Sequence, residues 1–111
     1  MGIFLKPGIT LTVTPQIDRM LHVAATVYAE VMGPAFSVVV TSGNDGKHMA
    51  GSLHYKDLAI DLRTGHAWEK PLMTQAEAQA LRDELDRRLG VGYDVVLEKD
   101  HVHCEWDPVT T

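Results

Sequence analysis

The strongest constraint on the fold is a pair of capped helix patterns that are separated and followed by short strand patterns. The first has Thr14 as N-cap and Pro15 at the first helical position, and the Gly-Pro pair at 33–34 ends it. The second opens with the capping box Thr-Gln-Ala-Glu at 74–77 and runs through Arg88. Apolar residues recur at helical spacing in both patterns, so each helix should pack one face against a core.

Five short stretches have the alternation or the β-branched content of strands: 9–13, 36–40, 58–62, 93–97 and 102–106. A turn-rich segment, Thr-Ser-Gly-Asn-Asp-Gly at 41–46, follows the second of them. The tight connection 98–101 joins the last two and predicts a hairpin. The order strand–helix–strand–strand–helix–strand–strand predicts a single α+β domain over residues 1–111.

Composition narrows the class of protein. A chain of 111 residues can bury about two thirds of its unfolded surface without disulfides. Cys104 is the only cysteine, which excludes an intramolecular disulfide and a Cys-rich zinc site. The net charge of −5 argues against nucleic-acid binding. No apolar run approaches the length of a membrane span, and the first residues lack the pattern of a signal peptide.

Residues suited to a zinc ion gather in two segments, Ser-Leu-His-Tyr-Lys-Asp-Leu-Ala-Ile-Asp at 52–61 and Asp-His-Val-His at 100–103. His54, Asp61 and His103 would supply two nitrogens and one oxygen and leave a fourth position to water. That open position is typical of catalytic rather than structural zinc. Asp100, three residues before His103, would be the general base that takes a proton from the water.

Strand alternation supports this hypothesis and also sets a condition on it. His101, His103 and Glu105 fall on one face of their strand, whereas Cys104 lies on the other. His103 can therefore point into a cleft. Strict alternation would put Asp100 and His103 on opposite faces, so Asp100 must lie in the turn before the strand begins.

Two other interpretations of these residues stay open. In the first, His54 and His103 are hydrogen-bonded polar groups of a sheet, and the aspartates cap turns. In the second, His101 replaces His103 on the metal and Glu98, three residues before it, is the base.

Segment 52–61 resembles the SxHxxGxAxD motif of peptidase family M15, which includes D-Ala-D-Ala carboxypeptidases and phage L-alanyl-D-glutamate endopeptidases. Segment 100–103 resembles the family's second motif, an acidic residue three before the last zinc-binding histidine. The resemblance covers roughly residues 36–108. It implies a fold like that of the Hedgehog/DD-peptidase proteins: an antiparallel sheet with helices on one face and zinc in the opposite groove.

The resemblance implies a role for each matching residue. His54, Asp61 and His103 match the zinc ligands, and Asp100 matches the catalytic base. Ser52 stands where the family has a serine beside the substrate site. The sequence departs from the motif at one position, where Asp57 replaces the glycine. If that position requires φ > 0, aspartate tolerates it better than most residues, at some cost.

The implied activity is that of a zinc metallopeptidase (a hydrolase) acting on peptidoglycan stem peptides in cell wall degradation. It would be either a phage endolysin-like endopeptidase or a D,D-carboxypeptidase. Candidates for contact with the substrate are Ser52, Arg63, His101 and His48. A carboxypeptidase also needs a cation for the free carboxylate, and candidates are Arg63, Lys47 and Lys56. We expect a monomer, made in the cytoplasm without a signal peptide and released to the cell wall by a hole-forming partner.

A different class of protein is the alternative: a non-catalytic zinc-binding structural or interaction module. Asp57 is the feature that supports it, because an extra carboxylate near the metal could repel an anionic substrate or bind a second cation. If glycine is a backbone requirement, Asp57→Gly should raise the stability or the activity of an enzyme. In a binding module the same change would leave hydrolysis at zero.

Overall fold

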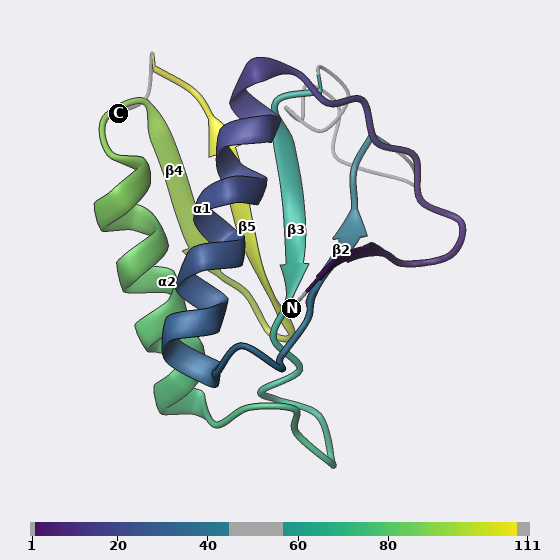
Figure 1. Cartoon of the computed structure of the whole chain (residues 1–111), viewed down its shortest axis with the longest axis vertical. Coiled ribbons are helices and arrows are strands. Elements are labelled where there is room, and N and C mark those ends of the chain that lie inside the picture. Colours follow the sequence, from purple (N-terminus) through teal and green to yellow (C-terminus); the bar gives the residue numbers. More distant parts are fainter. Residues whose placement is uncertain (1, 45–56, 109–111) are drawn as a thin grey trace.

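The computed structural model describes residues 2–44 and 57–108. The described chain forms a five-stranded sheet and two helices, and so is an α+β fold (Figure 1). In chain order the elements are β1 (Ile3–Leu5), α1 (Pro15–Met32), β2 (Val38–Ser42), β3 (Ala59–Arg63), α2 (Gln75–Leu89), β4 (Tyr93–Leu97) and β5 (His101–Trp106). In space the strands follow the order β1-β2-β3-β5-β4.

The two helices begin and end where the sequence predicts, within one residue. Thr14 caps α1, and its hydroxyl accepts a hydrogen bond from the Ile17 N–H at 3.2 Å. At the start of α2, Thr74 and Glu77 form the reciprocal bonds of the capping box, 2.8 and 3.1 Å long. These bonds satisfy N–H groups that the first turn of a helix leaves without partners.

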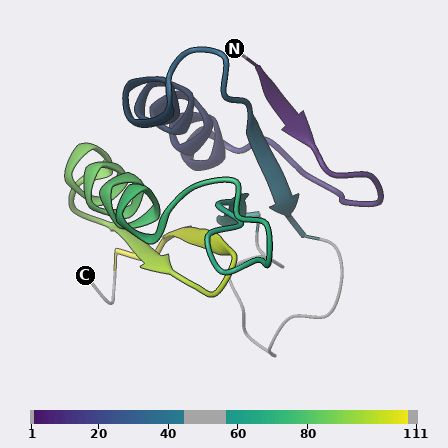
Figure 2. The ribbon, with the colours of Figure 1, turned by 90° about the horizontal axis from the view of Figure 1, so that it is seen from below.

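Both helices cover the same face of the sheet and pack side by side (Figures 1 and 2). Fully buried side chains from the helices and the sheet form one apolar cluster, which includes Ile17, Met20, Leu81, Leu85, Val38, Val40, Ile60, Leu62, Val102 and Cys104. Because strand side chains alternate, the neighbours of these residues in β3 and β5 must face the other way. The helix layer therefore leaves a polar face of the sheet for a site.

The first strand is not where the sequence predicts it, and the sheet is mixed rather than antiparallel. Segment 9–13 forms no strand; β1 lies at Ile3–Leu5 and pairs with β2 in parallel. A turn at 7–8 takes the chain away from the sheet after β1. Since β1 already occupies the edge of β2, the carbonyl of Thr10 instead accepts a hydrogen bond from the Asn44 N–H at 2.9 Å. The other three strand pairs are antiparallel, as expected.

The second strand is shifted by two residues from the predicted 36–40, so it includes the first two residues of the predicted turn segment. The cause is its pairing with β3, which continues past Val40 through a bulge: Val40 lies opposite Leu62, and Ser42 lies opposite Asp61. β3 is shifted by one residue at both ends from the predicted 58–62, β5 begins one residue before the predicted 102–106, and β4 matches its predicted bounds. The predicted hairpin is confirmed.

Candidate active site

Two of the three predicted zinc ligands lie side by side in the sheet. Asp61 in β3 is the direct partner of His103 in the antiparallel β3–β5 pair. The Asp61 Oδ1 atom is 2.9 Å from His103 Nδ1, and these side chains are only 13% and 20% exposed. His103 Nε2 lies 3.3 Å from a carboxylate oxygen of Glu105, which comes next on the same face. A half-buried imidazole thus lies between two carboxylates.

Asp100, the predicted base, lies in the turn before β5, as its odd spacing from His103 requires. The turn is held in place because the Asp100 carbonyl accepts hydrogen bonds from the backbone N–H groups of Thr64 and Gly65, at 3.0 and 2.9 Å. Its carboxylate lines the same cavity as Asp61. The end of β3 and the start of β5 therefore bring both aspartates to one place.

His101 bridges these two aspartates. Its Nδ1 atom is 2.7 Å from Asp100 Oδ1, and its Nε2 atom is 3.8 Å from Asp61 Oδ1. In the register that puts His101 on the metal, Nε2 would bind the ion while Nδ1 keeps its contact with Asp100. The direct pairing of Asp61 with His103 favours the register that puts His103 on the metal.

The neighbours of Asp100 and His103 shift their pKa values. The hydrogen bond from His101 holds the pKa of Asp100 below its usual range. Burial alone would raise this pKa, and a hydrogen bond from the Trp68 side chain lowers it further. Asp100 is therefore an ionised acceptor at neutral pH. Burial lowers the pKa of His103. The hydrogen bonds and negative charges of Asp61 and Glu105 raise it by more, so the pKa of His103 lies above its usual value. Both shifts follow from the pairing of acids with imidazoles.

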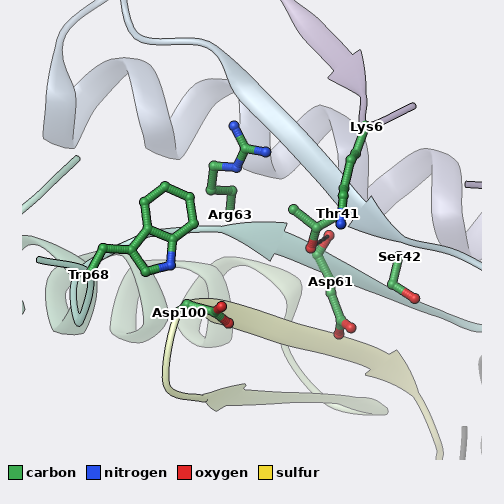
Figure 3. A pocket seen from close by; sticks show the side chains of 7 residues that line it. All are labelled: Lys6, Thr41, Ser42, Asp61, Arg63, Trp68 and Asp100. Atoms are coloured by element: carbon green, nitrogen blue, oxygen red, sulfur yellow. Dashed lines mark hydrogen bonds between the residues drawn. The ribbon is translucent and has the colours of Figure 1, made fainter. Parts of the chain in front are cut away.

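A cavity of about 220 Å³ opens beside these residues, lined by Lys6, Thr41, Ser42, Asp61, Arg63, Trp68 and Asp100 (Figure 3). Four of its residues were missed by the sequence analysis: Lys6, Thr41, Ser42 and Trp68. Polar residues at a strand end were a weak signal for Thr41 and Ser42, and the β2 bulge sets both opposite Asp61. Lys6 had no signal, because a lysine before Pro-Gly is typical of solvated turns.

The remaining predicted site residues, Ser52, His54 and His48, lie outside the described residues, as do Lys47 and Lys56. Within 2–44 and 57–108, no group of three His, Cys, Asp or Glu side chains is arranged to hold a metal. Asp61 and His103 nonetheless supply a carboxylate oxygen and an imidazole nitrogen at adjacent positions, which are donors that zinc prefers. These two residues fit a zinc site whose third predicted ligand is His54.

Asp57, at the position of the motif glycine, has a backbone φ of 55°. It is the only residue other than glycine with a positive φ in the described ranges. Its carboxylate accepts a hydrogen bond from the Asn44 side chain at 2.6 Å, and its carbonyl accepts one from the Thr14 hydroxyl at 2.9 Å. The position therefore has the left-handed conformation that glycine favours. Asp57 does not line the cavity, and its side chain stabilises the neighbouring segments.

Comparisons of the sequence with protein-family models and with curated proteins find no match. In the described ranges, neither helix combines the length and apolar character that a membrane crossing needs.

Proposed function

We propose that this protein is a zinc-dependent peptidase that cleaves the stem peptides of bacterial peptidoglycan. It would act as a phage endolysin-like endopeptidase or as a D,D-carboxypeptidase. One observation carries the proposal: Asp61 lies directly opposite His103, and the turn before β5 adds Asp100 to the same cavity. The resemblance of segments 52–61 and 100–103 to the two peptidase motifs supports it. Because the substrate lies outside the cytoplasm, the protein would act after release.

In the proposed reaction, His54, Asp61 and His103 would hold the zinc ion. When bound, zinc would supply Lewis acidity toward the peptide carbonyl and toward water. Asp100 would accept a proton from the attacking water at its carboxylate and return it to the leaving amine. His101 and Trp68 would orient that carboxylate, because both donate hydrogen bonds to it.

The test combines zinc content, measured by elemental analysis, with mass analysis of purified muropeptides after digestion. His54→Ala and Asp61→Ala should lose both zinc and turnover. Asp100→Ala should keep zinc and lose turnover by about 100-fold or more, since it removes only the proton acceptor. Asp86→Ala, an exposed aspartate on α2, is the matched control and should keep both.

The outcomes test the proposed base and distinguish a peptidase from a zinc-binding module without turnover. Full activity of Asp100→Ala would show that the proposed base is wrong. A parent protein that binds zinc and cleaves no muropeptide would instead be a zinc-binding module without turnover. If cleavage occurs, the masses of the products distinguish removal of a terminal D-Ala from cleavage within the stem peptide.

A further inference from the structure

The cavity beside the proposed metal site has two sides of opposite charge. Asp61 and Asp100 supply its carboxylates, and Lys6 and Arg63 supply its cations (Figure 3). In the view of Figure 3 the guanidinium of Arg63 lies between Trp68 and Lys6, away from the Asp100 carboxylate. The proposed chemistry uses only the acidic side.

Arg63 has no acidic partner among residues 2–44 and 57–108. Its Nε atom is buried and has no hydrogen-bond acceptor, and its guanidinium lies over the Trp68 ring, 5.5 Å from guanidinium carbon to ring centroid. Buried donors without an acceptor are rare, because removing them from water without a replacement bond is unfavourable. A half-buried guanidinium of this kind favours an anion at the part that faces the cavity.

The backbone holds both cations in place at the cavity. The Tyr28 hydroxyl donates a hydrogen bond of 2.9 Å to the carbonyl of Arg63. The Lys6 N–H donates one of 2.9 Å to the carbonyl of Val40, so the pairing of β1 with β2 determines where Lys6 lies.

The spacing along β3 relates the cations to the metal site. Arg63 lies two residues after Asp61 on the same face of the strand, a separation of roughly 7 Å. An anion bound at Arg63 would thus lie close to a peptide group held at Asp61. A metal at Asp61 would neutralise the acidic side and leave the cavity with a net positive charge.

We propose that Arg63, assisted by Lys6, binds a carboxylate of the substrate next to the peptide bond that is cleaved. This inference rests on the proposed function for the identity of the substrate. Two carboxylates of a stem peptide have the required chemistry: the C-terminal carboxylate and the α-carboxylate of a glutamyl residue. Arginine suits either one, because its planar fork can donate two parallel hydrogen bonds to a carboxylate.

The first experiment measures binding without turnover. The full chain, labelled with ¹⁵N and freed of metal by chelation, is titrated with three synthetic stem peptides: one with both carboxylates free, one with a C-terminal amide, and one with the glutamyl α-carboxyl as an amide. The Arg63 Nε–H and Trp68 indole N–H resonances report binding in the cavity. We expect one of the two amides to bind roughly 10- to 100-fold more weakly than the free peptide, and which amide it is identifies the carboxylate.

The variants assign that selectivity to the cations. Arg63→Gln should bind the free peptide and its amide with equal affinity, and Lys6→Gln should lower the preference in part. Arg63→Lys keeps the charge, loses the fork, and should retain a reduced preference. Arg87→Gln makes the same change at an exposed arginine on α2 and should behave as the parent.

The outcomes separate this inference from the proposed function. A parent that binds all three peptides equally would overturn the carboxylate site, and so would selectivity that survives in Arg63→Gln. Either result leaves the roles of the metal ligands and of Asp100 standing, since zinc content and hydrolysis measure those. If Arg63→Gln does not fold, the affinities of the parent and of Arg63→Lys for the free and amidated peptides still test the carboxylate site. Carboxylate selectivity in a protein that hydrolyses nothing would support the site and overturn the peptidase.

Discussion

The two faces of β3 and β5 are built from alternate residues of the same strands, yet different forces stabilise them. On the helix-covered face, Ile60, Leu62 and Val102 are fully buried in the apolar cluster. On the open face, Asp61 and His103 are half-buried and meet through a hydrogen bond of 2.9 Å. Burial of hydrocarbon is non-directional, whereas each polar group on the open face needs a particular partner in a particular place.

This difference separates the parts of the sheet that provide stability from those that provide chemistry. The helix-covered face should contribute most of the free energy of unfolding, because its side chains leave water completely. On the open face, imidazoles satisfy the carboxylates of Asp61 and Asp100, and the guanidinium of Arg63 stays without an anionic partner in the described ranges. The predictions below test how far the two faces are independent, from the largest expected effect to the smallest.

The sharpest contrast is between two neighbouring positions of β3, Leu62 and Asp61. Leu62→Ala should lower the free energy of unfolding by about 2–5 kcal/mol, because it leaves a cavity in the core. Asp61→Ala, in metal-free protein, should cost about 1–2 kcal/mol, since it removes a half-buried partner of His103. Urea denaturation followed by circular dichroism measures both. If both variants lose the same free energy of unfolding, the two faces do not differ in how much they contribute to stability.

A change confined to the open face is Trp68→Phe. It keeps an aromatic ring beside Arg63 and removes the N–H that donates to the Asp100 carboxylate. We expect kcat for muropeptide cleavage to fall about tenfold, the equivalent of one charge-assisted hydrogen bond, with stability nearly unchanged. Trp106→Phe, at the other end of β5, is the control for loss of an indole. A parallel fall in kcat for both variants would contradict a specific role of Trp68.

Tyr28 connects the two faces, because it is buried in α1 and donates to the carbonyl of Arg63. Tyr28→Phe should lower the free energy of unfolding by about 1 kcal/mol, since it leaves that carbonyl without its donor. It should also weaken selectivity for the carboxylate peptide. Tyr93→Phe keeps the ring contact with Trp106, 4.9 Å between centroids, and should cost less. If Tyr28→Phe lowers stability but leaves selectivity unchanged, the helix-covered face and the open face are independent of each other.

The smallest effect is expected at Asp57, where two contributions oppose each other. Asp57→Gly relieves a left-handed conformation that costs a non-glycine residue about 1 kcal/mol, but it loses the hydrogen bond from Asn44. We expect a net change within about 0.5 kcal/mol, which is smaller than the gain expected from the motif alone. Asp57→Ala keeps the strain and loses the bond, so it should be destabilised by about 1 kcal/mol. Thermal denaturation measures both, and an Ala variant as stable as the parent would show that the hydrogen bond from Asn44 contributes nothing to stability.

The helices and the hairpin could be predicted because their signals are local. The N-caps at Thr14 and Thr74 lie within three residues of the groups they satisfy, and the β4–β5 hairpin needs only a short turn. The first strand could not be predicted in this way. Segment 9–13 has better alternation than Ile3–Leu5, but a strand forms only where a partner edge is free, and that depends on the whole sheet.

The sequence by itself determined two capped helices and the polar face of β3 and β5 that carries Asp61 and His103. Each depends on a periodicity or a backbone preference that neighbouring residues set. Only the tertiary structure decided that Asp61 faces His103, that a bulge adds Ser42 to the cavity, and that Lys6 reaches it from the position just after β1. These contacts join residues far apart in the chain, and strand register, which no short stretch of sequence contains, sets their geometry.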